Sequence, residues 1–179
     1  MTQPARNAAQ DAAVLVPVFR GDDGDLKIVL VRRTEGGIHG GQIAFPGGKR
    51  SPDDRSLWET ALRETEEEIG LERARVHALE ELPVVDTLST GFRIYPFLGR
   101  LQPPPRWRLE PREIAEVLEV KVTDFLEPDR QGEEEWSLPE WPGPRRIRFF
   151  RVGEHKLWGA TYRILSPLIP RLVGGEWDV

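Results

Sequence analysis

Some kinds of chemistry are excluded because this sequence lacks the residues that they need. The 179 residues include no cysteine, which rules out disulfide bonds and thiolate chemistry. No apolar run approaches the roughly 20 residues that a membrane-spanning helix requires. The first dozen residues are polar and alanine-rich, without the apolar stretch of a signal peptide. We therefore expect a cytoplasmic protein that has no membrane partner.

The chain also lacks an excess of positive charge. Its net charge is −5, with 25 lysines and arginines against 30 acidic residues. Proteins that bind duplex nucleic acid neutralise its phosphates with a basic surface, so this balance argues against a nucleic-acid partner. An acidic protein that acts on a phosphorylated small molecule needs positive charge in its site, and a divalent cation is the simplest source.

The residues that are present predict one mixed α+β domain over residues 1–179. The hydrophobic fraction of 39% beside 31% charged residues is typical of a globular protein of this length. Apolar residues recur every four positions from Leu57 to Ile69, which predicts a helix that begins near Ser56 and ends at Gly70. A second helix is expected at about 159–172, and strands are expected at 13–19, 26–32, 76–85, 92–101 and 147–152.

Two segments are harder to interpret from the sequence. Residues 113–119 have helical spacing, although residues 117–122 are also compatible with a strand. Residues 136–144 are rich in proline and tryptophan, and we expect them to form an excursion on the surface.

Three glutamates in the first expected helix point to metal chemistry. Glu64, Glu67 and Glu68 are spaced i, i+3 and i+4, so they share one helix face. Like charges placed this way cost a few tenths of a kcal/mol per pair. Mg²⁺ prefers oxygen ligands and would reverse that repulsion. A solvated acidic surface is the alternative, but this run lies opposite an apolar stripe, follows a Gly-Gly turn and is closed by Gly70.

These residues resemble the Nudix box, usually written G-x5-E-x7-R-E-U-x-E-E-x-G-U, in which U is a bulky aliphatic residue. Residues 48–71 cover the box, and its second half matches Arg63-Glu64, Glu67-Glu68, Gly70 and Leu71. The resemblance extends over nearly the whole chain. It implies a Nudix α/β/α sandwich with a mixed β-sheet, and a metal-dependent pyrophosphohydrolase activity.

The sequence departs from the box at three points. Arg55 occupies the position of the first glutamate, and Asp54 is the nearest acid that could replace it. The interval from Gly48 to Arg63 is one residue longer than the pattern, and Thr65 stands where a larger aliphatic residue is usual. None of these departures removes a metal-binding carboxylate.

The resemblance also implies roles for individual residues. Glu67 and Glu68 are similar to the principal ligands of Mg²⁺ or Mn²⁺. Glu64 is similar to a further ligand or to a base that activates water. The backbone of Gly47 or Gly48 is similar to an additional ligand. Arg63 is expected to anchor the loop by pairing with Glu67 or Asp54, and Gly70 to end the helix. Many Nudix enzymes take another catalytic glutamate from a later segment, where this chain has Glu113 and Glu116.

Three segments outside the box are similar to the coenzyme A pyrophosphatases of the Nudix family. The first segment is Arg32-Arg33-Thr34, followed by His39-Gly40-Gly41-Gln42 and by Phe45-Pro46-Gly47-Gly48. The second is the acidic segment 113–120. The third is Leu157-Trp158-Gly159-Ala160-Thr161. The second arginine of that signature would fall near Ile38 and is missing. Arg32, Arg33 or Arg50 could grip a 3′-phosphate instead, with His39 and Gln42 positioning the substrate.

The resemblance leaves three functions open. The first is hydrolysis of coenzyme A, or of its derivatives, to 4′-phosphopantetheine and 3′,5′-ADP. The second is hydrolysis of ADP-ribose or another nucleoside diphosphate derivative. The third is a catalytically silent Nudix module that senses a ligand, although such a module would be expected to have lost carboxylates that are all retained here. The partner in each case is a nucleotide-type small molecule, and a homodimer is among the assemblies that relatives form.

Overall fold

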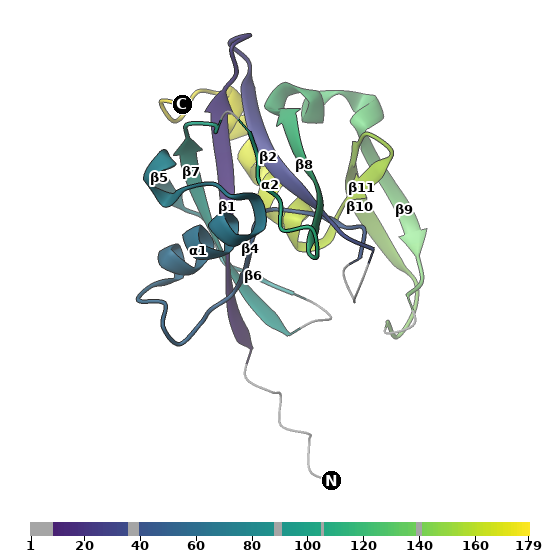
Figure 1. Cartoon of the computed structure of the whole chain (residues 1–179). Helices are drawn as coiled ribbons and strands as arrows, with labels where there is room; N and C mark the ends of the chain where they lie inside the picture. The colour runs from purple at the N-terminus through teal and green to yellow at the C-terminus, as the bar shows by residue number, and fades with distance from the viewer. Residues whose placement is uncertain (1–8, 36–39, 88–90, 105, 139–140) are drawn as a thin grey trace.

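A large mixed sheet lies between two helices, and a small second sheet lies beside it (Figure 1). The computed structural model describes residues 9–35, 40–87, 91–104, 106–138 and 141–179. Within these residues, no helix is long and apolar enough to cross a membrane.

The large sheet is centred on β1 (Gln10–Arg20). This strand runs parallel to β7 (Phe92–Leu101) and antiparallel to β2 (Leu26–Arg33). The other strands pair with these three and are β3 (Ile43–Ala44), β4 (Gly47–Lys49), β5 (Val76–Glu81), β6 (Val85–Asp86) and β8 (Ile114–Lys121). The strands predicted at 13–19, 26–32 and 92–101 are confirmed.

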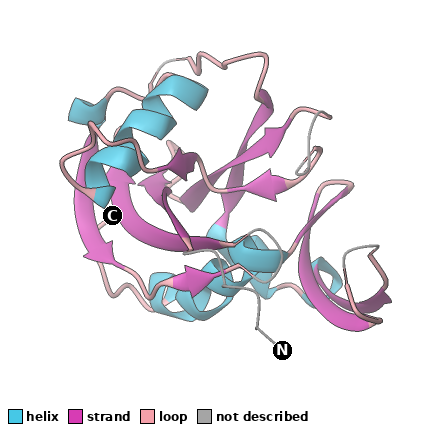
Figure 2. Ribbon diagram, turned by 90° about the horizontal axis from the view of Figure 1, so that it is seen from below, coloured by secondary structure: helices cyan, strands magenta, loops and turns pink. Residues whose placement is uncertain are grey.

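The two faces of the sheet are covered by different helices. Side chains alternate along a strand, so Val29 and Val31 of β2 pack with α1 (Leu57–Ile69), whereas Ile28 and Leu30 pack with α2 (Gly159–Val173). Figure 2 shows the helices on opposite sides of the strands. The predicted α/β/α sandwich with a mixed sheet and both predicted helices are therefore confirmed.

The second sheet is antiparallel and three-stranded. It contains β9 (Gln131–Trp136), β10 (Arg145–Val152) and β11 (His155–Leu157), and it follows two short 3-10 helices, η2 (Val122–Leu126) and η3 (Pro128–Arg130). The ring of Trp136 stacks on Phe149 with centroids 6.3 Å apart, and Phe149 is buried. The predicted strand at 147–152 is confirmed. The surface excursion is shorter than expected, because Trp136 ends β9.

The helical interpretation of residues 113–119 is wrong, because this segment forms β8 against the edge of β2. Arg32 pairs with Glu116 and Arg33 pairs with Ile114, so a β-bulge leaves Ala115 unmatched. The extra residue brings Ile114 and Val117, three positions apart, to the same face of the sheet, where both pack in the cluster beneath α1. A bulged strand therefore reproduces the i, i+3 spacing of a helix.

The predicted strand at 76–85 is divided. β5 ends at Glu81 and β6 begins at Val85, with Pro83 between them. Proline has no N–H to donate to a neighbouring strand, so the ladder is interrupted there. A short 3-10 helix, η1 (Arg73–Arg75), connects α1 to β5.

Candidate active site

The sequence fixes both ends of α1 through local hydrogen bonds. The hydroxyl of Ser56 accepts a hydrogen bond from the N–H of Glu59 at 3.1 Å, which caps the helix start. Gly70 ends the helix with a left-handed φ of 69°, which glycine adopts without strain, and its N–H donates to the carbonyl of Glu66. The predicted cap at Gly70 is confirmed. The caps fix where α1 begins and ends, and its apolar stripe determines which residues face the sheet.

The three box glutamates line one pocket of about 400 Å³. The rest of its lining is Glu110, Arg112 and Glu113, which belong to the turn that precedes β8. The N–H of Glu110 donates to the carbonyl of Glu68 at 2.9 Å, which fastens this turn to the helix. The pocket therefore brings together residues that lie more than forty positions apart in the sequence.

Glu68 is the most deeply placed of these carboxylates, with only 2% of its surface exposed. Its Oε2 accepts a hydrogen bond from the N–H of Gly47 at 2.9 Å, and its Oε1 lies 3.4 Å from Nη1 of Arg33. Burial raises the pKa of Glu68 to about 7, despite these two partners, and the nearby charges of Glu64 and Glu113 act in the same direction. Burial beside other carboxylates thus disfavours the charged form of Glu68.

Glu64 lies directly against the glycine pair. A side chain at Gly48 would place its Cβ 2.4 Å from the carboxyl carbon of Glu64, so any larger residue would displace the Glu64 carboxylate. Burial raises the pKa of Glu64, although Nη1 of Arg63 lies 2.9 Å from its Oε1 and opposes the shift. Glu67 is more exposed, and its Oε2 accepts a hydrogen bond from Arg63 at 3.0 Å.

Arg63 joins the helix to the loop that precedes it. Its Nε donates to Oδ1 of Asp54 at 2.9 Å, and its Nη2 donates to Oδ2 of Asp54 at 3.0 Å and to the carbonyl of Lys49 at 3.1 Å. Asp54 is buried and also accepts hydrogen bonds from Ser51 and Thr60. The Arg63 guanidinium holds the pKa of Asp54 well below its usual range. Arg63 thus contacts both Glu67 and Asp54, the two partners proposed for it.

The structure separates the residues expected to bind substrate. Arg33 does not line the carboxylate pocket but contacts one of its carboxylates, since its Nη2 lies 3.8 Å from Glu113. Arg32 pairs with Glu116 at 3.3 Å, and Glu116 does not line the pocket. Gln42 lies beside Arg33, since its carbonyl accepts a hydrogen bond from the Arg33 N–H at 3.0 Å. His39 lies outside the described residues.

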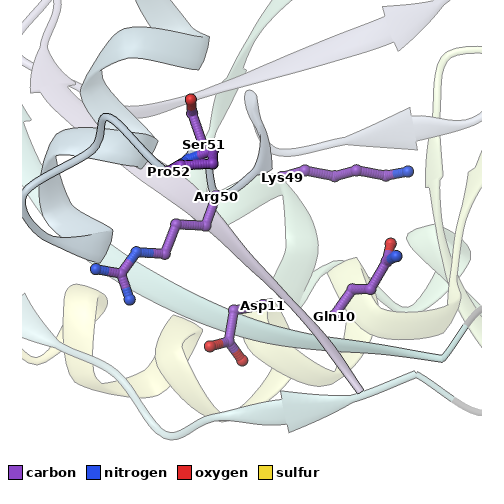
Figure 3. Close-up of a pocket in the computed structure, with 6 residues that line it drawn as sticks. All are labelled: Gln10, Asp11, Lys49, Arg50, Ser51 and Pro52. Atoms are coloured by element: carbon purple, nitrogen blue, oxygen red, sulfur yellow. The ribbon is translucent and has the colours of Figure 1, made fainter. Parts of the chain in front are cut away.

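Arg50 lines a second pocket of about 520 Å³, next to the glycine pair (Figure 3). Its other lining residues are Gln10, Asp11, Lys49, Ser51 and Pro52. Figure 3 shows the side chains of Lys49 and Arg50 leaving the chain in opposite directions. Among the described residues, no carboxylate lies within ion-pair distance of Arg50, and its guanidinium donates one hydrogen bond, to the carbonyl of Asp54 at 3.5 Å.

Sequence reasoning missed Glu110 and Arg112. The signal was weak, because Pro111 marks a turn but nothing local indicates that this turn docks onto the end of α1. That placement depends on the pairing of β8 with β2, which is a long-range contact.

The donor chemistry of the carboxylate pocket fits a divalent cation. Five glutamates supply oxygen ligands of the kind that Mg²⁺ and Mn²⁺ prefer. Burial raises the pKa of Glu64 and of Glu68, and a cation bound between these carboxylates would offset the cost of their charged forms. In the described part of the chain, no three acidic or histidine side chains form a ready-made cation cage. Cation binding would therefore require carboxylates to turn away from Arg63 and Arg33.

Comparisons with known proteins agree with the box. Residues 9–141 match the NUDIX domain family. Nudix hydrolase 15, mitochondrial, from Arabidopsis thaliana is 35% identical over 171 residues, which cover 90% of this chain and 58% of that protein. The Nudix hydrolase NudL of Yersinia enterocolitica is 38% identical over 159 residues, which cover 88% of this chain and 78% of that protein.

A solved structure shares the fold. The MutT protein from Methanosarcina mazei Go1 aligns over 93% of this chain and 98% of its own, with a TM-score of 0.58 and 20% identity. The chain spans only 58% of the Arabidopsis relative, somewhat more than half its length. Because the family match covers most of the sequence and the Yersinia relative is similar over most of both proteins, the chain belongs to the Nudix hydrolase family.

Proposed function

We propose that this chain hydrolyses the diphosphate bond of a nucleoside diphosphate linked to a second group. The observation that carries this proposal is the pocket in which Glu64, Glu67 and Glu68 of one helix meet Glu113 of a distant turn. Burial and the neighbouring carboxylates raise the pKa of Glu64 and of Glu68. Such an accumulation of negative charge has little structural benefit, but it suits a site that takes up a divalent cation together with an anionic substrate.

The residues of the site would have three roles: metal ligands, an additional catalytic glutamate, and a structural pair that holds the loop against the helix. Glu64, Glu67 and Glu68 would hold Mg²⁺ or Mn²⁺, and the backbone of Gly48, which lies against the Glu64 side chain, would supply an additional carbonyl ligand. The bound cation would polarise a phosphate oxygen and lower the pKa of an attacking water. Glu113 rather than Glu116 is the better candidate for the additional catalytic glutamate, because only Glu113 lines the pocket. Arg63 and Asp54 would hold the loop and the helix in register.

Coenzyme A is the substrate that we propose within this reaction class. Its support is the resemblance of the segments around Arg32-Arg33, Gln42 and Trp158 to the coenzyme A pyrophosphatases. The structure suggests which arginine would take the 3′-phosphate. Arg32 and Arg33 already have carboxylate partners, whereas Arg50 has none among the described residues and lines a pocket beside Gly48. An arginine whose donors are free is the better phosphate ligand.

A side-by-side turnover assay tests the proposal. Coenzyme A, dephospho-coenzyme A, ADP-ribose and NADH would each be offered with Mg²⁺ or Mn²⁺. The Glu67→Gln variant serves as the blank, and Glu66→Gln is the matched control, because Glu66 lies on the same helix but pairs with Arg73 away from the pocket. We expect coenzyme A to be the best substrate, with little turnover by Glu67→Gln and nearly normal turnover by Glu66→Gln.

Each other outcome has a defined meaning. If ADP-ribose or NADH is preferred, the coenzyme A assignment fails and the diphosphate hydrolysis survives. If no substrate is turned over faster by the wild type than by Glu67→Gln, the chain is a silent ligand-binding module and the proposed function is wrong.

A further inference from the structure

Arg112 is the one cation in the lining of the carboxylate pocket, which it shares with five glutamates. The other two arginines near these carboxylates are engaged, since Arg63 contacts Asp54 and Glu67, and Arg33 contacts Glu68 and Glu113. The guanidinium of Arg112 has no ion pair and no side-chain hydrogen bond within the parts of the chain that the structure describes. Its five N–H donors are therefore free.

The backbone of Arg112, in contrast, is held on both sides. Its carbonyl accepts a hydrogen bond from the hydroxyl of Thr34 at 2.9 Å, and its N–H donates to the carboxylate of Glu110 at 3.2 Å. The N–H of Thr34 donates to the carbonyl of Glu113 at 2.9 Å, and Glu110 is bonded to the end of α1. The turn is thus fastened to β2 and α1, and it presents an uncommitted guanidinium at the pocket.

We propose that Arg112 binds the diphosphate group of the substrate. A planar guanidinium matches two phosphate oxygens at once, and a charge-assisted pair of this kind is stronger than one between neutral groups. The anionic substrate must approach a pocket that is itself rich in carboxylates, so a cation that the protein leaves unpaired favours its binding. The inference rests on the proposed diphosphate chemistry, but it holds for any nucleoside diphosphate derivative.

This role predicts that the loss of Arg112 affects the binding of two ligands differently. Removing the positive charge of Arg112 should weaken binding of an anionic diphosphate. The same change should leave Mn²⁺ binding in the absence of nucleotide unchanged or slightly tighter, because a nearby positive charge repels a cation. An arginine that served only to hold the acidic turn in place would instead weaken both ligands together.

The experiment measures both affinities by calorimetry. The first probe is α,β-methylene-ADP, which carries a diphosphate that cannot be hydrolysed, and it is titrated in the presence of Mg²⁺. The second probe is Mn²⁺ alone, without nucleotide. The variants are Arg112→Gln, Arg112→Lys and the matched control Arg106→Gln, an exposed arginine of the same connecting segment that does not line the pocket. We expect Arg112→Gln to raise the Kd for the analogue at least tenfold, because losing a hydrogen bond to a charged group costs roughly that factor.

The controls make the result decisive. Arg112→Lys should recover part of the affinity, since it restores the charge but not the fork, and Arg106→Gln should behave as the wild type. An analogue affinity in Arg112→Gln within twofold of the wild type would overturn the inference, as would a wild type that does not bind the analogue at all. Failure of the coenzyme A proposal is seen separately, because it appears only in the substrate preference of the wild type.

Discussion

The guanidinium of Arg63 binds both carboxylate oxygens of Asp54, with Nε–Oδ1 at 2.9 Å and Nη2–Oδ2 at 3.0 Å. This two-point contact joins α1 to the loop that follows β4 and carries Arg50, and it is largely shielded from water, since the Asp54 side chain is 6% exposed and that of Arg63 is 22% exposed. Asp54 stands one position from the place where the Nudix pattern has a glutamate, and the sequence has an extra residue in the same loop. The aspartate therefore supports the loop by pairing with Arg63.

Replacing Asp54 by asparagine should destabilise the fold. The variant keeps the shape of the side chain but loses a charged partner of Arg63, and hydrogen bonds to charged groups contribute about 2 kcal/mol each. We expect the free energy of unfolding in urea to fall by about 2 kcal/mol, with Asp53→Asn, an exposed neighbour, as the control. Equal stabilities of the two variants would contradict the structural role of the Asp54–Arg63 pair.

The Asp54–Arg63 pair should make the stability of the fold fall as the pH is lowered. The pKa of Asp54 is lowered in the folded protein, so its stabilising effect is present above the unfolded pKa of about 3.9 and is lost as the pH falls toward the folded value. Urea unfolding between about pH 5 and pH 3 should therefore show a steeper loss of stability in the wild type than in Asp54→Asn. Parallel curves would argue that other carboxylates dominate the acid response.

Glu68 should give the cation-free protein the opposite response to pH. Its folded pKa of about 7 lies above its ordinary value of 4.5, so its contribution is fully present below pH 4.5 and is lost as the pH rises through about 7. This pKa shift corresponds to a change of at most about 3 kcal/mol in the free energy of unfolding. In EDTA, Glu68→Gln should show a flatter dependence of unfolding free energy on pH between 5 and 8. A variant that retains the wild-type slope would show that another group titrates in this range.

Divalent cations should restore the stability that the cation-free protein loses when Glu68 becomes charged. Mg²⁺ or Mn²⁺ binds the deprotonated carboxylates, so adding it at pH 8 should raise the Tm of the wild type. The increase should be smaller in Glu68→Gln, and Glu66→Gln should respond as the wild type does. Scanning calorimetry with and without EDTA measures this difference, and an equal increase in all three proteins would place the cation elsewhere.

Gly48→Ala should damage the site more than the fold. The added Cβ would lie 2.4 Å from the Glu64 carboxyl carbon, which must move, but Glu64 is the far end of a flexible side chain. We expect turnover to fall at least tenfold, because small displacements of catalytic groups have large effects on rate, while stability changes by about 1 kcal/mol or less. Gly143→Ala is the control, since no atom lies within 4 Å of a Cβ added there. Normal turnover by Gly48→Ala would remove Glu64 from the mechanism.

The parts of the fold that depend on local signals were predictable from the sequence. Ser56, the four-residue apolar stripe and Gly70 are enough to define α1, because capping and amphipathicity are properties of neighbouring residues. β8 was not recovered in the same way, since its bulge at Ala115 gives Ile114 and Val117 a helix-like spacing. Its strand character depends on β2, more than eighty residues earlier in the chain.

The candidate site, like the fold, was predictable only where neighbouring residues define it. The carboxylates of α1 could be grouped from their spacing, whereas Glu110 and Arg112 could not, because a turn reaches the pocket only through its bonds to Glu68 and Thr34. Arg32, Arg33 and Arg50 were equivalent candidates in the sequence. Only the placement of Glu116, Glu68 and Glu113 distinguishes the arginines that are already paired from the one that is not.

The bulge at Ala115 also bears on how relatives are compared. If this residue were deleted, Arg32 and Arg33 could keep their partners Glu116 and Ile114 in a regular ladder, so the core beneath α1 would be unchanged. Homologous chains can therefore differ in length by one residue here without refolding. An alignment that forbids a gap at this point would shift Glu113 of this chain by one position against a relative that lacks the bulge.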